Sequence, residues 1–70
     1  ETIIFYESVH RIKETLTFIK ELFADREMTL CRELTKKFEE IKTGSVEDIC
    51  EYYQDKELKG EFVIIIRGKT

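Results

Sequence analysis

Two short polar segments come directly after apolar runs that predict β-strands. The first, residues 5–11, places a carboxylate, a hydroxyl, an imidazole and a guanidinium close together. The second, residues 31–36, contains an arginine–glutamate pair, a threonine and a lysine, and two more glutamates follow at positions 39 and 40. Carboxylates can accept protons and cationic side chains can bind phosphates. Strand ends that open into loops are common sites of chemistry in α/β proteins, so the sequence predicts a site here.

The first segment has a functional and a structural interpretation. Tyr6, Glu7 and Ser8 precede a predicted helix, whose free N–H groups suit an anionic or polar ligand. His10 and Arg11 then fall in its first turn, where cations oppose the helix dipole, and this hints at phosphate contact. The structural alternative is that Ser8 only caps the helix and the charged side chains are solvated. His10 has no visible orienting partner, so we do not assign it as a general base.

In the second segment, Arg32 and Glu33 point to opposite faces of one predicted strand. One of them must face a covered side, where an unpaired charge is costly, so it needs a partner. Three glutamates are possible partners of Arg32: Glu7, Glu39 and Glu40. A buried ion pair and a functional site are both compatible with this pattern. Lys36 and Lys37 either contact phosphates or form a solvated connection.

Composition limits the classes of protein. Seventy residues make one small domain of marginal stability alone. The chain has 15 acidic and 12 basic residues, and a net charge of -3 argues against an electrostatic grip on nucleic acid by this piece alone. No apolar stretch approaches the roughly 20 residues that span a bilayer. We expect Cys31 and Cys50 to be buried reduced thiols, and we reject a metal site because His10 is the only histidine.

The hydrophobic pattern predicts six elements in the order β-α-β-β-α-β. Strands are expected over residues 2–6, 28–34, 38–42 and 62–66, with a turn at 43–44. One helix is expected from a Ser8 cap to about Ala24, and another from a Ser45–Asp48 capping box to a break at Lys59–Gly60. The last strand is apolar throughout, which favours a central strand covered on both faces. The predicted class is α/β of α+β type, either a ferredoxin-like sandwich or part of a mixed sheet flanked by helices.

The segments together resemble a known family. In order and spacing they are similar to the C-terminal part of the small-subunit ribosomal RNA cytidine 2′-O-methyltransferases, of the tetrapyrrole (corrin/porphyrin) methylase superfamily. The resemblance covers nearly all 70 residues. It is carried by residues 5–11, 32–36 (Arg-Glu-Leu-Thr-Lys), 39–40, Gly44 and 59–63.

This resemblance implies a cytoplasmic two-domain enzyme, usually a homodimer, with S-adenosylmethionine held between the domains and ribosomal RNA of the small subunit as substrate. Residues 1–70 would form most of the second domain. The N-terminal domain and the first strand of the second domain would be absent. We expect a fragment of a longer chain, with no membrane partner, that is inactive by itself.

The resemblance also implies roles for individual residues. Two groups would face the cofactor cleft: Tyr6, Glu7 and Ser8, and Gly60, Glu61 and Phe62. Another group would shape the cleft and meet the RNA: Arg32, Glu33, Thr35 and Lys36, with His10 and Arg11 as phosphate contacts. Glu7 or Glu33 would accept the proton of the ribose hydroxyl. Val9 replaces the proline usual in the family, so this loop is expected to be less rigid.

Two other functions compete with this interpretation. The first is methylation of a tetrapyrrole by another branch of the superfamily, against which the Arg-Glu-Leu-Thr-Lys motif of residues 32–36 argues. The second is a non-catalytic ferredoxin-like module for regulation or oligomerisation. The β-α-β-β-α-β order is the only support for that module.

Overall fold

The computed structural model describes residues 1–34 and 37–68, and of residues 37–39 the backbone alone. The described elements follow the predicted β-α-β-β-α-β order, which is confirmed. They are β1 (Ile3–Ser8), α1 (Ile12–Phe23), β2 (Glu27–Leu34), β3 (Lys37–Ser45), α2 (Val46–Gln54) and β4 (Glu61–Ile66).

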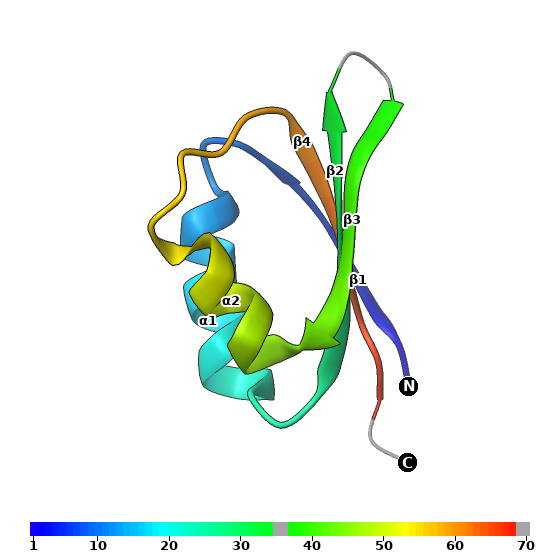
Figure 1. The fold of residues 1–70 in the computed structure, drawn as a ribbon. Coiled ribbons are helices and arrows are strands. Elements are labelled where there is room, and N and C mark those ends of the chain that lie inside the picture. The colour runs from blue at the N-terminus through cyan, green and yellow to red at the C-terminus, as the bar shows by residue number, and fades with distance from the viewer. Residues whose placement is uncertain (35–36, 69–70) are drawn as a thin grey trace.

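The four strands form one sheet in the order β1-β4-β2-β3, and both helices lie on the same face of it (Figure 1). Every described pair is antiparallel. The α+β form of the prediction is confirmed, whereas the expected mixed sheet is an antiparallel one. The reason is that β4 inserts between β1 and β2, the two strands that run in the same direction. The predicted central position of the last strand is confirmed as well.

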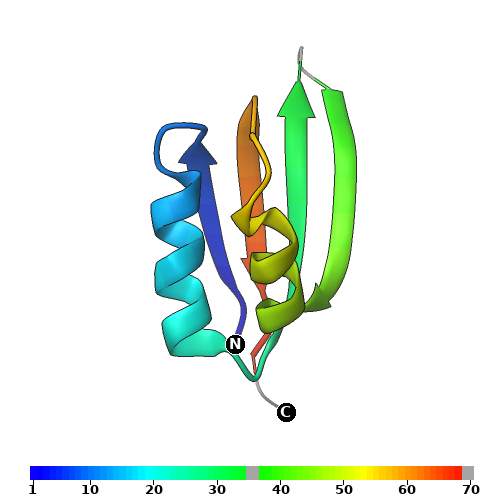
Figure 2. The ribbon, with the colours of Figure 1, turned by 60° about the vertical axis from the view of Figure 1, so that its left-hand side comes forward.

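The core lies between the sheet and the two helices (Figure 2). Phe62, Ile64 and Ile66 of β4 are buried beneath the helices, while Val63 and Ile65 on the other face are only half-buried. The prediction that β4 is covered on both faces is therefore wrong for this chain, because both helices pack on one side. Each fully buried aliphatic or aromatic side chain contributes about 1.5–3 kcal/mol. The helix-facing side thus holds the fold together.

The start of α1 differs from the prediction. Ser8 does not cap the helix, which begins at Ile12 after Arg11, without a side-chain cap. Instead Glu7 and Ser8 extend β1 by pairing with β4, so the chain needs a turn at residues 9–11 before the helix can start. His10 and Arg11 consequently lie before the first helical turn and not in it.

The start of α2 agrees with the prediction. The Ser45 hydroxyl accepts a hydrogen bond from the backbone N–H of Asp48 at 3.0 Å. The predicted turn at Thr43–Gly44 is wrong, since both residues pair with β2 and continue β3. The chain passes from strand to helix at this cap, where the Val46 N–H also donates to the carbonyl oxygen of Arg26 at 2.8 Å. Among residues 1–34 and 37–68, no helix has the length and apolarity that a bilayer crossing requires.

Gly60 controls the entry into β4. Its φ angle is +96°, which side chains other than glycine rarely adopt. A Cβ atom at this position would also overlap the carbonyl oxygen of Glu33 at the end of β2. Glycine is therefore required for β4 to begin in register beside β2.

We predict that Gly60→Ala lowers the free energy of unfolding by about 2 kcal/mol or more, through backbone strain and the clash with Glu33. Gly44→Ala is the matched control, because a Cβ there makes only ordinary contacts, 3.7 Å from Ile49. Urea denaturation of both variants measures the difference. Equal stability of the two variants would contradict this account of Gly60.

Candidate functional site

Three of the polar segments singled out in the sequence meet at one end of the sheet. β4 pairs with both β1 and β2, so its first residues lie beside the last residues of those strands. Glu61 stands between Ser8 and Glu33 in one row across the sheet. In the next row, Phe62 stands between Glu7 and Arg32. Residues far apart in the sequence are thus brought into a single candidate site.

The site is divided between the two faces of the sheet. By strand alternation, Glu7, Phe62 and Arg32 share the face covered by the helices, whereas the neighbouring row lies on the open face. The open-face group consists of Tyr6, Ser8, Glu33 and Glu61. The two candidate proton acceptors, Glu7 and Glu33, therefore lie on opposite sides of the sheet. They cannot act together on one hydroxyl group.

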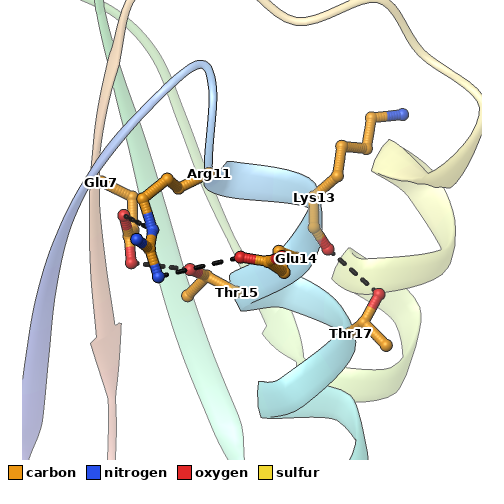
Figure 3. Close-up of polar contacts among 6 residues, drawn as sticks. All are labelled: Glu7, Arg11, Lys13, Glu14, Thr15 and Thr17. Atoms are coloured by element: carbon orange, nitrogen blue, oxygen red, sulfur yellow. Dashed lines mark hydrogen bonds and ion pairs between the residues drawn. The ribbon is translucent and has the colours of Figure 1, made fainter.

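Glu7 is held by the first turns of α1 (Figure 3). Its Oε2 accepts a hydrogen bond from the Thr15 hydroxyl at 2.6 Å, and its Oε1 lies 3.9 Å from the Nε of Arg11. Arg11 also reaches Glu14 at 3.7 Å but is largely exposed, so these ion pairs add less than about 1 kcal/mol each. Phe18 and these side chains line a shallow hollow of about 330 Å³. Thr15 thus fixes the Glu7 carboxylate against the helix.

Arg32 finds its partner in Glu40 of β3, one of the three glutamates considered from the sequence. Its Nε lies 3.3 Å from the Glu40 Oε1, and both side chains are about three-quarters buried. The aromatic ring of Tyr53 from α2 completes this cluster. Burial and the neighbouring Glu40 carboxylate raise the pKa of the Tyr53 hydroxyl, which therefore stays protonated.

The open-face group offers hydrogen-bond acceptors and negative charge. Glu33 and Glu61 are direct cross-strand partners, an unfavourable arrangement for like charges without a cationic ligand or neighbour. Tyr6 is 77% exposed and Ser8 is half-buried beside them. These groups fit a ligand with hydroxyl groups and positive charge. Phe62 is 1% exposed and belongs to the core, so only its backbone groups can contact a ligand.

Several predicted site residues lie elsewhere or outside the description. His10 is exposed in the turn after β1, at the same end of the sheet. Thr35 and Lys36 lie outside the described residues, as does the side chain of Glu39. Thr15 and Tyr53 were not predicted from the sequence as neighbours of Glu7 and Glu40. Each could have been found from the sequence, because Thr15 and Tyr53 place a hydroxyl group on the apolar face of their helix.

The two cysteines differ in environment. Cys50 is buried and its thiol donates to the carbonyl oxygen of Leu16 at 3.4 Å. Cys31 is only half-buried on the open face, so the prediction that both thiols are buried is wrong for Cys31. The physical reason is again that no helix covers that face. Both cysteines are unpaired, as predicted.

Comparison with known proteins adds to this geometry. The chain is 44% identical over 70 residues to the ribosomal RNA small subunit methyltransferase I of Bacillus subtilis. It is 45% identical over 69 residues to that of Rickettsia prowazekii, and 48% identical over 68 residues to that of Streptococcus pyogenes. These matches cover 97–100% of the chain and 24–25% of each relative. No family model matches.

The chain resembles a segment of these ribosomal RNA methyltransferases. The resemblance inferred from its motifs is therefore confirmed. The chain spans about a quarter of the length of the curated relatives it matches.

We predict that Thr15→Val lowers the free energy of unfolding by about 1–2 kcal/mol, because the partly buried Glu7 carboxylate loses its donor. Thr17→Val is the matched control, since the Thr17 hydroxyl only bonds back to the Lys13 carbonyl on the exposed side of α1 (Figure 3). Chemical denaturation at neutral pH compares the two variants. A loss for Thr17→Val as large as that for Thr15→Val would refute a specific Glu7–Thr15 interaction.

Burial raises the pKa of the Cys50 thiol from 9.0 to about 11. Because the folded state favours the protonated thiol, its stabilising effect is complete below pH 9.0 and is lost as the pH rises towards about 11. We expect iodoacetamide at pH 8 to modify Cys31 well before Cys50, as followed by mass spectrometry of the folded chain. Faster modification of Cys50 would contradict the buried, protonated state.

Proposed function

We propose that the chain is part of an S-adenosylmethionine-dependent methyltransferase that methylates a ribose 2′-hydroxyl in small-subunit ribosomal RNA. The observation that carries the proposal is the convergence of three motif segments at one end of the sheet. These are the segments on which the resemblance to this family rests. The printed names of the relatives support ribosomal RNA as substrate.

The division between the two faces suggests separate roles. Tyr6, Ser8 and Glu61 share the open face and would contact the cofactor, with the backbone of Gly60 and Phe62 beside them. Hydroxyl and carboxylate oxygens can accept from sugar hydroxyls and an ammonium group, and the acids offset a positive sulfonium charge. Glu7 would line the cleft from the helix-covered side. The residues present therefore fit this cofactor.

Glu33 is the better proton acceptor of the two carboxylates. Glu7 already accepts a hydrogen bond from Thr15 and lies beside Arg11. Glu33 shares the open face with the cofactor candidates, and it forms no ion pair with the described side chains, those of residues 1–34 and 40–68. Its carboxylate would take the proton as the ribose oxygen becomes a nucleophile.

The chemistry requires positioning above all. When bound, S-adenosylmethionine supplies a methyl group on a positively charged sulfur, which leaves as a neutral thioether and is therefore a good leaving group. The side chains of this chain would hold the ribose hydroxyl in line with that methyl group and exclude water, and such alignment lowers the barrier by several kcal/mol. Arg32, Thr35 and Lys36, with His10 and Arg11 nearby, would bind phosphates of the RNA.

For the whole protein we propose a cytoplasmic homodimer of two-domain subunits, in which residues 1–70 form most of the C-terminal domain. The relatives' length supports further parts of the polypeptide, because the chain matches only 24–25% of it. A cofactor held between two domains explains why this chain carries one half of a site. The isolated chain would then be inactive.

The competing functions receive less support. A tetrapyrrole substrate is not favoured by relatives named for ribosomal RNA. A ferredoxin-like module is disfavoured by the strand order: in such a sheet the first and third strands form the central pair, whereas here β4 and β2 do.

The test is methyl transfer by the full-length protein with radiolabelled S-adenosylmethionine. Unmethylated small ribosomal subunits and a porphyrin precursor are offered side by side. We expect label in the RNA that survives as an alkali-resistant dinucleotide, because a 2′-O-methyl group blocks cleavage at that position. Label in alkali-sensitive nucleotides would indicate base methylation. Label in the porphyrin alone would move the protein to the other branch of the superfamily.

We predict that Glu33→Gln in the full-length protein lowers kcat by about 100-fold or more, as expected for loss of a general base. Arg32→Ala should lower kcat/KM about tenfold or more, through loss of a charged contact. Two residues of α1 outside the site provide the controls, the exposed Glu21 as Glu21→Gln and the half-buried Lys20 as Lys20→Ala, and kcat and KM of both should stay close to those of the parent. Small, equal effects of all four variants would reject these site assignments.

A further inference from the structure

Two buried polar atoms in the described structure lack a hydrogen bond of good geometry: the Tyr53 hydroxyl and the Nε of Arg32. The Glu40 carboxylate is 3.3 Å from the Arg32 Nε, and burial together with this same carboxylate raises the pKa of the Tyr53 hydroxyl. A buried polar atom without a partner is costly, so such a pair calls for an explanation. A slight tightening of this cluster would satisfy both atoms through Glu40.

The cluster joins three elements. Tyr53 comes from α2 and is 1% exposed, Arg32 from β2, and Glu40 from β3. β2 and β3 pair at this point, with Arg32 directly opposite Glu40, and a register shift follows immediately. The Tyr53 ring is locked in the core beneath α2. Its hydroxyl is therefore a fixed point against which the Glu40 carboxylate can be oriented.

Arg32 is held by only one edge. Glu40 contacts the Nε, and it is the one ion-pair partner of Arg32 among the described side chains, those of residues 1–34 and 40–68. A guanidinium carries four further N–H donors on its two terminal nitrogens. About a quarter of the side chain is exposed. An arginine whose Nε lies beside a carboxylate, and whose side chain is a quarter exposed, can turn its terminal nitrogens to a phosphate for bidentate binding.

We propose that Tyr53 is a positioning residue, which orients Arg32 through Glu40 so that the guanidinium binds a backbone phosphate of the RNA. This inference rests on the proposed function and assigns Tyr53 a role that the sequence motifs did not include. A tyrosine that served packing alone would gain nothing from its hydroxyl, since phenylalanine fills the same apolar stripe without burying an oxygen.

The adjacent Tyr52 supplies a matched control. It is 42% exposed, and its ring lies against Lys42 and Lys56 and packs edge-to-face on the Tyr53 ring, with centroids 4.9 Å apart. Phenylalanine at position 52 keeps these ring contacts and removes only the hydroxyl group. In the full-length protein we expect Tyr53→Phe to raise KM for small ribosomal subunits about three- to tenfold, with kcat changed less than about twofold. Tyr52→Phe should change neither. In an Arg32→Ala background, Tyr53→Phe should have no further effect on KM.

An unchanged KM for Tyr53→Phe would overturn the inference, as would an equal effect in the Arg32→Ala background. Should Tyr53→Phe fail to fold, Glu40→Gln provides the same test, since it keeps the shape and removes the charge. A readout independent of methyl transfer is the NMR signal of the Arg32 Nε–H. Tyr53→Phe should shift this signal and speed its hydrogen exchange, and Tyr52→Phe should not.

This second readout separates the two proposals. A parent protein that methylates no RNA, but whose Arg32 signal responds to Tyr53→Phe, would refute the proposed function and retain the positioning of Arg32. If the parent is active but Tyr53→Phe changes neither the Arg32 Nε–H signal nor KM, the positioning role is refuted and the proposed function is retained.

Discussion

The structure depends on the pairing of β4 with both β1 and β2. Among the described strands, β4 is the one that hydrogen-bonds to both β1 and β2, and so joins β1 to the hairpin of β2 and β3 in one sheet. Its alternate side chains Phe62, Ile64 and Ile66 are buried under both helices, so sheet and core are stabilised by the same residues. Gly60, which lets β4 begin beside β2, is therefore required for both the sheet and the core.

The same pairing creates the candidate site. A central antiparallel strand brings its own start beside the ends of its two neighbours, and those ends carry the polar segments. Strand alternation then separates the side chains by face. Glu7 and Arg32 are tied to helices and strands by specific partners, Thr15 and Glu40. Glu33 and Glu61 remain on the open face, where a ligand is the natural counterpart of their charges.

Much of the fold was predictable because local patterns carry it. Apolar periodicity located both helices and all four strands, and the Ser45 cap was recognised from its spacing to Asp48. Two of the errors fell at element boundaries. Ser8 resembled a cap, yet the ladder with β4 extended β1 through it, and Gly44 resembled a turn, yet pairing with β2 kept it in a strand. Pairing energy between distant segments outweighed local preference in both places.

The sequence by itself determined the element order, the apolar faces and the polar segments, because these follow from the spacing of residue types along the chain. It also determined that one of the neighbours Arg32 and Glu33 needed a partner of opposite charge, since an unpaired charge under a covered face is costly. Only the tertiary structure decided that the partner is Glu40, that Tyr53 joins them, and that Glu7 and Glu33 occupy opposite faces. Those outcomes depend on strand order and register, which a single strand's pattern does not contain.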